Sequence, residues 1–162
     1  MPVITDANVL IDYIESDISM LALYSDKIEQ VIIPSVIVDE VEQLSLDDCE
    51  SHGFLVIEEE LEVLSNAANF HHGPLSFEDK VCLYLAKSLE SATCITNEKA
   101  LHKFCEKDNI PVKRGLKLLI ELVEADHLEA EEAIKVVYMI HNVNPHHIHQ
   151  GVVDEFIRLI TG

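Results

Sequence analysis

Short apolar runs, each followed by a segment of helical character, constrain this chain more than any other feature. Strands that are apolar on both faces are typical of parallel sheets covered by helices. Their alternation with helices predicts an α/β fold, a doubly wound and about five-stranded parallel sheet with helices on both faces. The runs expected as strands are Val3–Ile4, Val31–Ile33, Phe54–Ile57, Thr93–Thr96 and Ile110–Lys113.

The 162 residues are enough for one domain with a sizeable core, and no repeat or linker divides them. We therefore expect a single domain, its last helices packing on the sheet or on a partner. Residues 47–53 are expected to form a loop. Helices are expected over 9–14, 19–24, 35–46 with Ser35 as N-cap, 58–70, 77–90, from a Thr96 or Asn97 cap to about 107, 115–124, 129–141 and about 148–160.

The formal charge of −19 opposes non-specific nucleic-acid binding and favours a cation or a basic protein partner. The charge is unevenly spread, since residues 80–117 hold eight bases and four acids. The apolar runs are too short for a membrane span, and no secretory signal is expected, so the expected location is cytoplasmic. The four cysteines are too widely spaced for a zinc knuckle or a redox pair.

Four acids stand where a functional site is expected. Asp6 and Glu98 follow strands, and ligands of open α/β sheets bind at the carboxyl ends of the strands. Glu40 has the helical neighbours Val36, Ile37, Gln43 and Leu44, which turns it toward the core. Asp79 heads a row that is otherwise apolar, formed with Cys82, Leu83 and Ala86.

Each acid also has an ordinary structural explanation. Ser76 and Asp79 resemble a capping box, and an acid such as Glu98 is favoured in the first turn of a helix. Together, however, the four acids can converge on one edge of the sheet. Carboxylates held close repel one another unless they are protonated or bridged by cations, and oxygen ligands favour Mg²⁺ or Mn²⁺.

Four motifs that follow one another in this order resemble those of PIN-domain ribonucleases, a family that includes VapC-type toxins of toxin–antitoxin pairs. The resemblance covers about residues 2–113. The motifs are DANVL from Asp6, PSVIVDEV from Pro34, LSFED from Leu75 and ITNEKAL from Ile95.

This resemblance implies a Rossmann-like, three-layer PIN fold with a core over about 2–113 and a helical extension over about 115–162. It also implies Mg²⁺- or Mn²⁺-dependent RNA cleavage in which Asp6, Glu40, Asp79 and Glu98 are the catalytic and metal-site acids. Asn8 and Asn97 would support them. The family more often has Asp where this chain has Glu98, whose longer side chain can still reach a metal.

The basic window flanks two of the acids, and Lys80 and Lys99 are its best candidates for RNA binding. The alternative is that its lysines form the solvated faces of amphipathic helices. The nine histidines, including His71 and His72 and a cluster at 146, 147 and 149, complete no familiar zinc pattern.

We therefore expect a metal-dependent endoribonuclease that hydrolyses RNA phosphodiester bonds. The toxin of a toxin–antitoxin pair is one form that this function would take, and the expected partners are RNA and an antitoxin or other basic protein. Relatives commonly form homodimers, and no membrane association is expected. The alternative is a catalytically weak or inactive PIN-fold module that binds protein or nucleic acid, which the acidic excess and Glu98 favour. A phosphate-transfer enzyme lacks support, because the chain has no glycine-rich phosphate loop.

Overall fold

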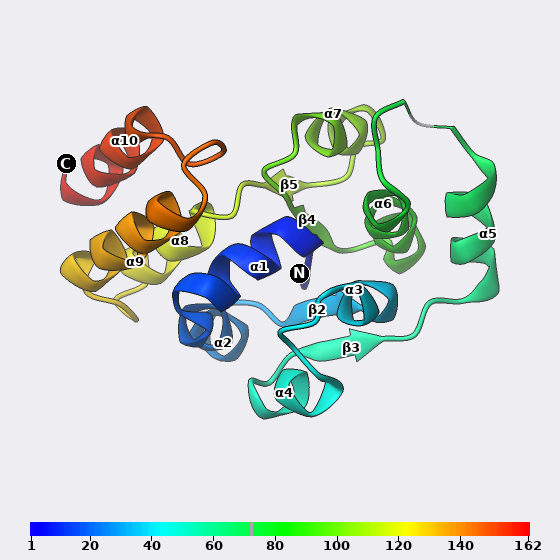
Figure 1. Ribbon diagram of the computed structural model, residues 1–162, viewed down its shortest axis with the longest axis horizontal. Coiled ribbons are helices and arrows are strands. Elements are labelled where there is room, and N and C mark those ends of the chain that lie inside the picture. Colours follow the sequence, from blue (N-terminus) through cyan, green and yellow to red (C-terminus); the bar gives the residue numbers. More distant parts are fainter. Residues whose placement is uncertain (72) are drawn as a thin grey trace.

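The computed structural model describes residues 1–71 and 73–162, and its centre is a five-stranded parallel sheet (Figure 1). The strands lie in the order β3-β2-β1-β4-β5, so β1 is central and the chain winds outward from it in both directions. This confirms the predicted α/β fold. The strands are β1 (Val3–Thr5), β2 (Val31–Pro34), β3 (Leu55–Ile57), β4 (Thr93–Ile95) and β5 (Val112–Lys113).

The three inner strands are buried along their whole length, which explains why their sequences are apolar without alternation. The register places Ile4 beside Ile32 on one side and beside Cys94 on the other. Because all strands are parallel, β1 and β4 end at the same edge of the sheet. Asp6 and Thr96 therefore leave neighbouring strands side by side.

Helices cover both faces of the sheet, and Figure 1 shows α1 and α6 on opposite sides of β1 and β4. The helix α6 packs on β1, β2 and β4, whereas α8, α9 and α10 stack on α1, α2 and one another. The helices are α1 (Ala7–Ser16), α2 (Ile18–Lys27), α3 (Ser35–Glu40), α4 (Leu46–Ser51), α5 (Leu61–Asn69), α6 (Phe77–Leu89), α7 (Lys99–Lys107), α8 (Lys117–Glu124), α9 (Ala130–Val143) and α10 (Gln150–Thr161).

The prediction of one helix over 35–46 is wrong, and so is the loop over 47–53. The helix α3 ends at Glu40, and Val41 adopts an extended backbone that buries its side chain. A new helix, α4, starts after Ser45, whose hydroxyl and backbone N–H form a complete capping box with Asp48. The run of acids there looked like a loop, but it is the acidic first turn of a capped helix.

Two further boundaries moved because of tertiary contacts. Ser35 is the first residue of α3 and not its N-cap, which is Pro34. The helix expected to begin at Gly115 begins at Lys117. Gly115 instead donates its N–H to Asn97 (3.0 Å) and accepts the Tyr13 hydroxyl (2.7 Å), so it fastens the start of α8 to α1 and to the end of β4.

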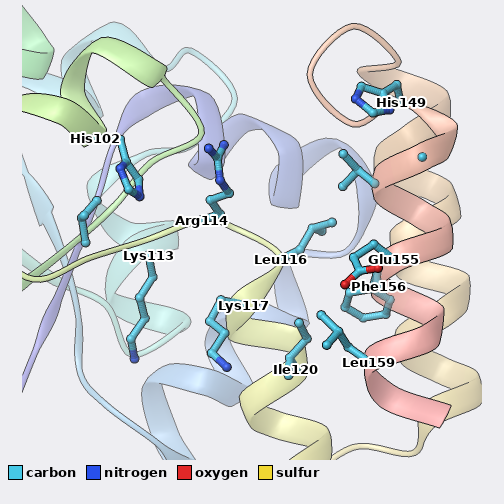
Figure 2. A pocket seen from close by; sticks show the side chains of 13 residues that line it. His102, Lys113, Arg114, Leu116, Lys117, Ile120, His149, Glu155, Phe156 and Leu159 are labelled. Carbon is cyan, nitrogen blue, oxygen red and sulfur yellow. The ribbon is translucent and has the colours of Figure 1, made fainter. Parts of the chain in front are cut away.

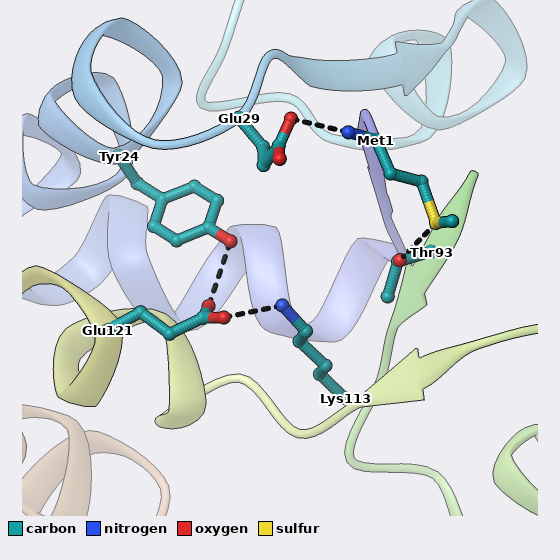
Figure 3. Close-up of polar contacts among 6 residues, drawn as sticks. All are labelled: Met1, Tyr24, Glu29, Thr93, Lys113 and Glu121. Carbon is teal, nitrogen blue, oxygen red and sulfur yellow. Dashed lines mark hydrogen bonds and ion pairs between the residues drawn. The ribbon is translucent and has the colours of Figure 1, made fainter. Parts of the chain in front are cut away.

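Polar contacts also fasten the C-terminal helices to the sheet (Figure 3). The Tyr24 hydroxyl and the Lys113 ammonium bind the two oxygens of Glu121 at 2.8 and 2.5 Å, which joins α2, β5 and α8. Asn144, the C-cap residue of α9, donates its side-chain amide to the buried Asp12 carboxylate of α1 at 3.0 Å. In the described part of the chain no helix is long and apolar enough to cross a membrane.

Candidate functional site

Asp6 is held at the point where β1 ends and α1 begins. It is the N-cap of α1, and its carboxylate accepts the Val9 N–H at 2.8 Å. The second carboxylate oxygen accepts the Thr96 hydroxyl at 2.5 Å, from the end of the neighbouring strand β4. Asp6 is only 1 % exposed, so both oxygens are fixed by the fold and not by solvent.

Burial raises the pKa of Asp6 from 3.8 to about 7, because a charged carboxylate loses its hydration there. The hydrogen bonds from Thr96 and Val9 oppose this rise, and the charges of Asp79 and Glu98 add to it. Asp6 therefore shares an electrostatic environment with two of the other predicted acids. Near neutral pH its carboxyl group is therefore partly protonated.

A cavity of about 440 Å³, which we call the acid pocket, opens above this edge of the sheet. Three of the four predicted acids line it, together with the predicted supporting residue Asn8, whereas Asp6 is buried and does not line it. The acid pocket is lined by Ala7, Asn8, Ile11, Glu40, Pro74, Ser76, Glu78, Asp79 and Glu98.

Asp79 lies in the first turn of α6, where the Ser76 hydroxyl accepts its N–H at 3.1 Å. The capping contact expected from the sequence is thus present. Burial, and then the charge of Glu98, raise the pKa of Asp79 to about 6, and hydrogen bonds with Ser76 oppose this rise. The Asp79 side chain therefore interacts with the cap residue Ser76 and also lines the acid pocket.

Glu98 is the N-cap of α7, and its carboxylate accepts the Asn8 side-chain amide at 2.8 Å. Its N–H donates to the Thr96 hydroxyl at 2.9 Å, so Thr96 connects Glu98 to Asp6. Asn97 turns the other way and accepts the Gly115 N–H. Asn97 supports the loop behind the site and does not line the acid pocket.

Glu40 reaches the acid pocket from the last residue of α3. It is exposed, so the prediction that it leans toward the core is wrong, because the helix that would have continued past it ends there. The start of α3 is anchored by the buried Glu59, which accepts the Ser35 hydroxyl (2.6 Å) and the Val36 N–H (3.0 Å).

The sequence reasoning missed three residues of this region: Thr96, Glu59 and Glu78. Thr96 has a signal, since it is a hydroxyl at the carboxyl end of a strand, but the sequence pattern predicts it only as a helix cap. Glu59 lies in a run of three glutamates, and nothing in the run marks it as the buried one. Glu78 precedes Asp79 and lines the same pocket.

Lys80 and Lys99 do not line the acid pocket, and their role in RNA binding stays a prediction. Of the paired histidines, His71 is exposed, and His72 lies outside the described residues. Within the described residues, no three His, Cys, Asp or Glu side chains are close enough to form a ready-made metal site. A zinc site built from the histidines therefore has no geometric support among these residues.

The chemistry of the acid pocket nevertheless fits Mg²⁺ or Mn²⁺. Among the described residues, its charged lining groups are all carboxylates, and no lysine or arginine forms an ion pair with them. Such ions usually keep several waters and need only one or two protein carboxylates together with substrate phosphates. Burial is the main reason that the pKa values of Asp6 and Asp79 are raised, and the charge of Glu98 adds to the rise in both, so a cation here would meet carboxylates that lack compensating charge.

The comparison with known families agrees with this geometry. The family model described as DUF3368, a PIN domain, matches residues 2–161, nearly the whole chain. Neither a curated protein nor a solved structure matches the chain significantly. The match takes in the strands, the four acids and the C-terminal helices alike. The chain therefore belongs to the PIN-domain family.

Proposed function

We propose that this protein is a metal-dependent endoribonuclease that hydrolyses RNA phosphodiester bonds at the acid pocket. PIN domains are generally nucleases, which sets the class of reaction. The observation that carries the proposal is geometric: Thr96 links the buried Asp6 to Glu98 by hydrogen bonds, at the edge of a pocket that Glu98, Asp79 and Glu40 line together. A pocket with this much uncompensated negative charge is suited to cations and not to bare phosphate.

In this proposal Asp6, Glu40, Asp79 and Glu98 hold Mg²⁺ or Mn²⁺, which supplies an activated water and charge stabilisation at the phosphate. Asp6 is oriented by Val9 and Thr96, so its oxygens are fixed before any cation binds. Asn8 fixes the Glu98 carboxylate by its hydrogen bond. In this proposal the attacking group is the water that the cation would activate, and no side chain forms a covalent intermediate.

The test compares cleavage of a labelled RNA pool by the wild type and by Asp6→Asn, with Mn²⁺ or with chelator. Asn is isosteric and keeps an acceptor for the Val9 N–H, so the fold is expected to survive. Asp26→Asn is the matched control, because Asp26 is exposed and does not line the acid pocket. We expect Mn²⁺-dependent cleavage by the wild type and the control, and loss of it in Asp6→Asn.

Equal cleavage by Asp6→Asn and wild type would exclude catalysis at this pocket. If neither protein cleaves RNA and calorimetry detects no cation binding, the protein is instead a binding module on the PIN fold. If the protein binds the cation but cleaves no RNA, the proposed metal site is supported and the proposed RNA cleavage is refuted.

We further propose that the protein acts with a basic protein partner, such as the antitoxin of a toxin–antitoxin pair, and forms a homodimer. The support is the net charge of −19, which favours a basic partner, and the family resemblance. A neighbouring gene for a small basic protein and co-purification of its product would support the first part. Light scattering of the purified chain tests the second.

A further inference from the structure

A second and third cavity lie on the other side of the Asn97–Glu98 segment from the acid pocket. One, which we call the basic cavity, has a volume of about 330 Å³. The other, the apolar cavity, has about 720 Å³ and lies between β5, α8 and α10 (Figure 2). The two cavities adjoin, since both are lined by Arg114, Leu116, His149 and Val152.

The basic cavity begins directly beside the proposed site. Asn97 lines it, whereas its neighbour Glu98 lines the acid pocket. Asn97 and Glu98 are consecutive residues, so the acid pocket and the basic cavity open on either side of one short segment that follows β4. An RNA strand that crosses this segment would present one phosphate to the acid pocket and a neighbouring nucleotide to the basic cavity.

Among the described residues that line the basic cavity, Arg114 supplies the permanent positive charge. It is exposed, and among the described residues no carboxylate lies within ion-pair distance of it. Its neighbour Lys113, in contrast, is neutralised by Glu121. Figure 2 shows the Arg114 guanidinium turned away from Lys113 and Lys117, toward the end of the cavity where His149 lies.

The other polar groups of the basic cavity are suited to the same ligand. His147 and His149 are exposed and bring imidazole nitrogens from the loop between α9 and α10. The start of α10 lies at His149, so its helix dipole adds positive potential there. In a chain of net charge −19, an unpaired arginine with hydrogen-bond donors around it is complementary to a phosphate.

The apolar wall explains why the occupant is a nucleotide and not a free phosphate. Leu116 and Val152 line both cavities, and Leu159, which is 51 % exposed, extends the wall along α10. A base that is unstacked from its neighbours has apolar faces to cover, which is why single strands are bound on apolar and planar side chains. Duplex RNA would keep its bases stacked and leave this wall uncovered.

We propose that the basic and apolar cavities bind single-stranded RNA next to the scissile phosphate, Arg114 holding a backbone phosphate and the Leu116–Val152 wall a base. This inference rests on the proposed function. It assigns a role to the C-terminal helices, which supply His147, His149 and Val152. A docked protein segment is the competing occupant, and the test separates the two.

The test measures fluorescence anisotropy of a labelled single-stranded RNA pool with chelator present, so that no cleavage occurs, and then cleavage with Mn²⁺. The variants are Arg114→Ala, His149→Glu and His149→Lys. Matched controls are Lys135→Ala and His127→Glu, which change the same charges at exposed positions outside both cavities. Circular dichroism checks that each variant is folded.

We expect Arg114→Ala to weaken RNA binding about tenfold. The slope of log K against log salt concentration should become less steep by about 0.7, because one phosphate contact is lost. His149→Glu should weaken binding, and His149→Lys should tighten it, with both controls unchanged. This reversal of sign is expected for a phosphate-bearing ligand. In the variants that bind RNA more weakly, KM for cleavage should rise while kcat stays unchanged.

Three results would overturn the inference. If the wild type binds and cleaves RNA but Arg114→Ala and His149→Glu match it, the cavities do not bind RNA and are free for a protein segment, while the proposed function stands. If both His149 variants weaken binding equally, the shape of the cavity and not its charge is responsible. If the wild type neither binds nor cleaves RNA, the proposed function fails together with the inference.

Discussion

Replacing Asp6 by Asn should change how the stability of this protein depends on pH. The native state holds the Asp6 carboxyl at a pKa of about 7, against 3.8 for the ordinary group. The folded chain therefore binds a proton at Asp6 over a pH range where the unfolded chain has lost it. Stability from this group is present at low pH and is lost as the pH rises through 7.

The size of the effect follows from the two pKa values. A difference of one pKa unit is worth about 1.4 kcal/mol, so between pH 5 and pH 8 the wild type should lose about 3 kcal/mol at Asp6. Asn does not titrate and can keep the Val9 cap. Relative to wild type, Asp6→Asn should therefore gain about 3 kcal/mol in free energy of unfolding between pH 5 and pH 8.

Urea unfolding in metal-free buffer at pH 5, 6, 7 and 8 measures this difference directly. Asp79, whose pKa is raised to about 6, contributes to both curves and largely cancels in the comparison. Asp26→Asn is the control and should run parallel to wild type, since Asp26 is exposed. Parallel curves for Asp6→Asn and wild type would refute the claim that burial and neighbouring acids raise the pKa of Asp6.

The same samples test the metal site. At pH 8, Mn²⁺ at about 100 times its dissociation constant should stabilise the wild type by about 3 kcal/mol through binding to the native state alone. Asp6→Asn should gain much less, because it lacks one carboxylate. Equal stabilisation of both proteins would place the cation elsewhere.

Three structural predictions concern residues around the site and are measured by urea unfolding. Asn144→Ala should cost about 1–3 kcal/mol, increasingly so at higher pH, because it leaves the buried Asp12 carboxylate without its donor. Glu59→Ala should cost about 1–2 kcal/mol and weaken Mn²⁺ binding, because Glu59 caps the helix that carries Glu40. Gly115→Ala should cost about 1–2 kcal/mol, since an added Cβ would lie 3.2 Å from the Val9 side chain. The matched controls, expected to change stability by less than about 0.5 kcal/mol, are Asn142→Ala and Glu60→Ala.

The core of the fold was predictable because the pattern that encodes it is local. Apolar runs without alternation occur where a strand is covered on both faces, and the five expected strands are the five observed. Helix boundaries were less predictable. The break after Glu40 depends on burying Val41 and Leu44, and the late start of α8 depends on bonds from Gly115 to residues distant in sequence.

The sequence alone determined which acids are candidates: Asp6 and Glu98 follow parallel strands, whose carboxyl ends meet at one edge of the sheet, and Glu40 and Asp79 stand beside apolar positions of their helices. It could not determine how each acid is held. Only the tertiary structure buries Asp6 under Thr96, leaves Glu40 exposed at a helix end and turns Asn97 away from Glu98. The unpaired charge of Arg114 was equally hidden, because whether an arginine has a partner depends on which elements the fold brings beside it.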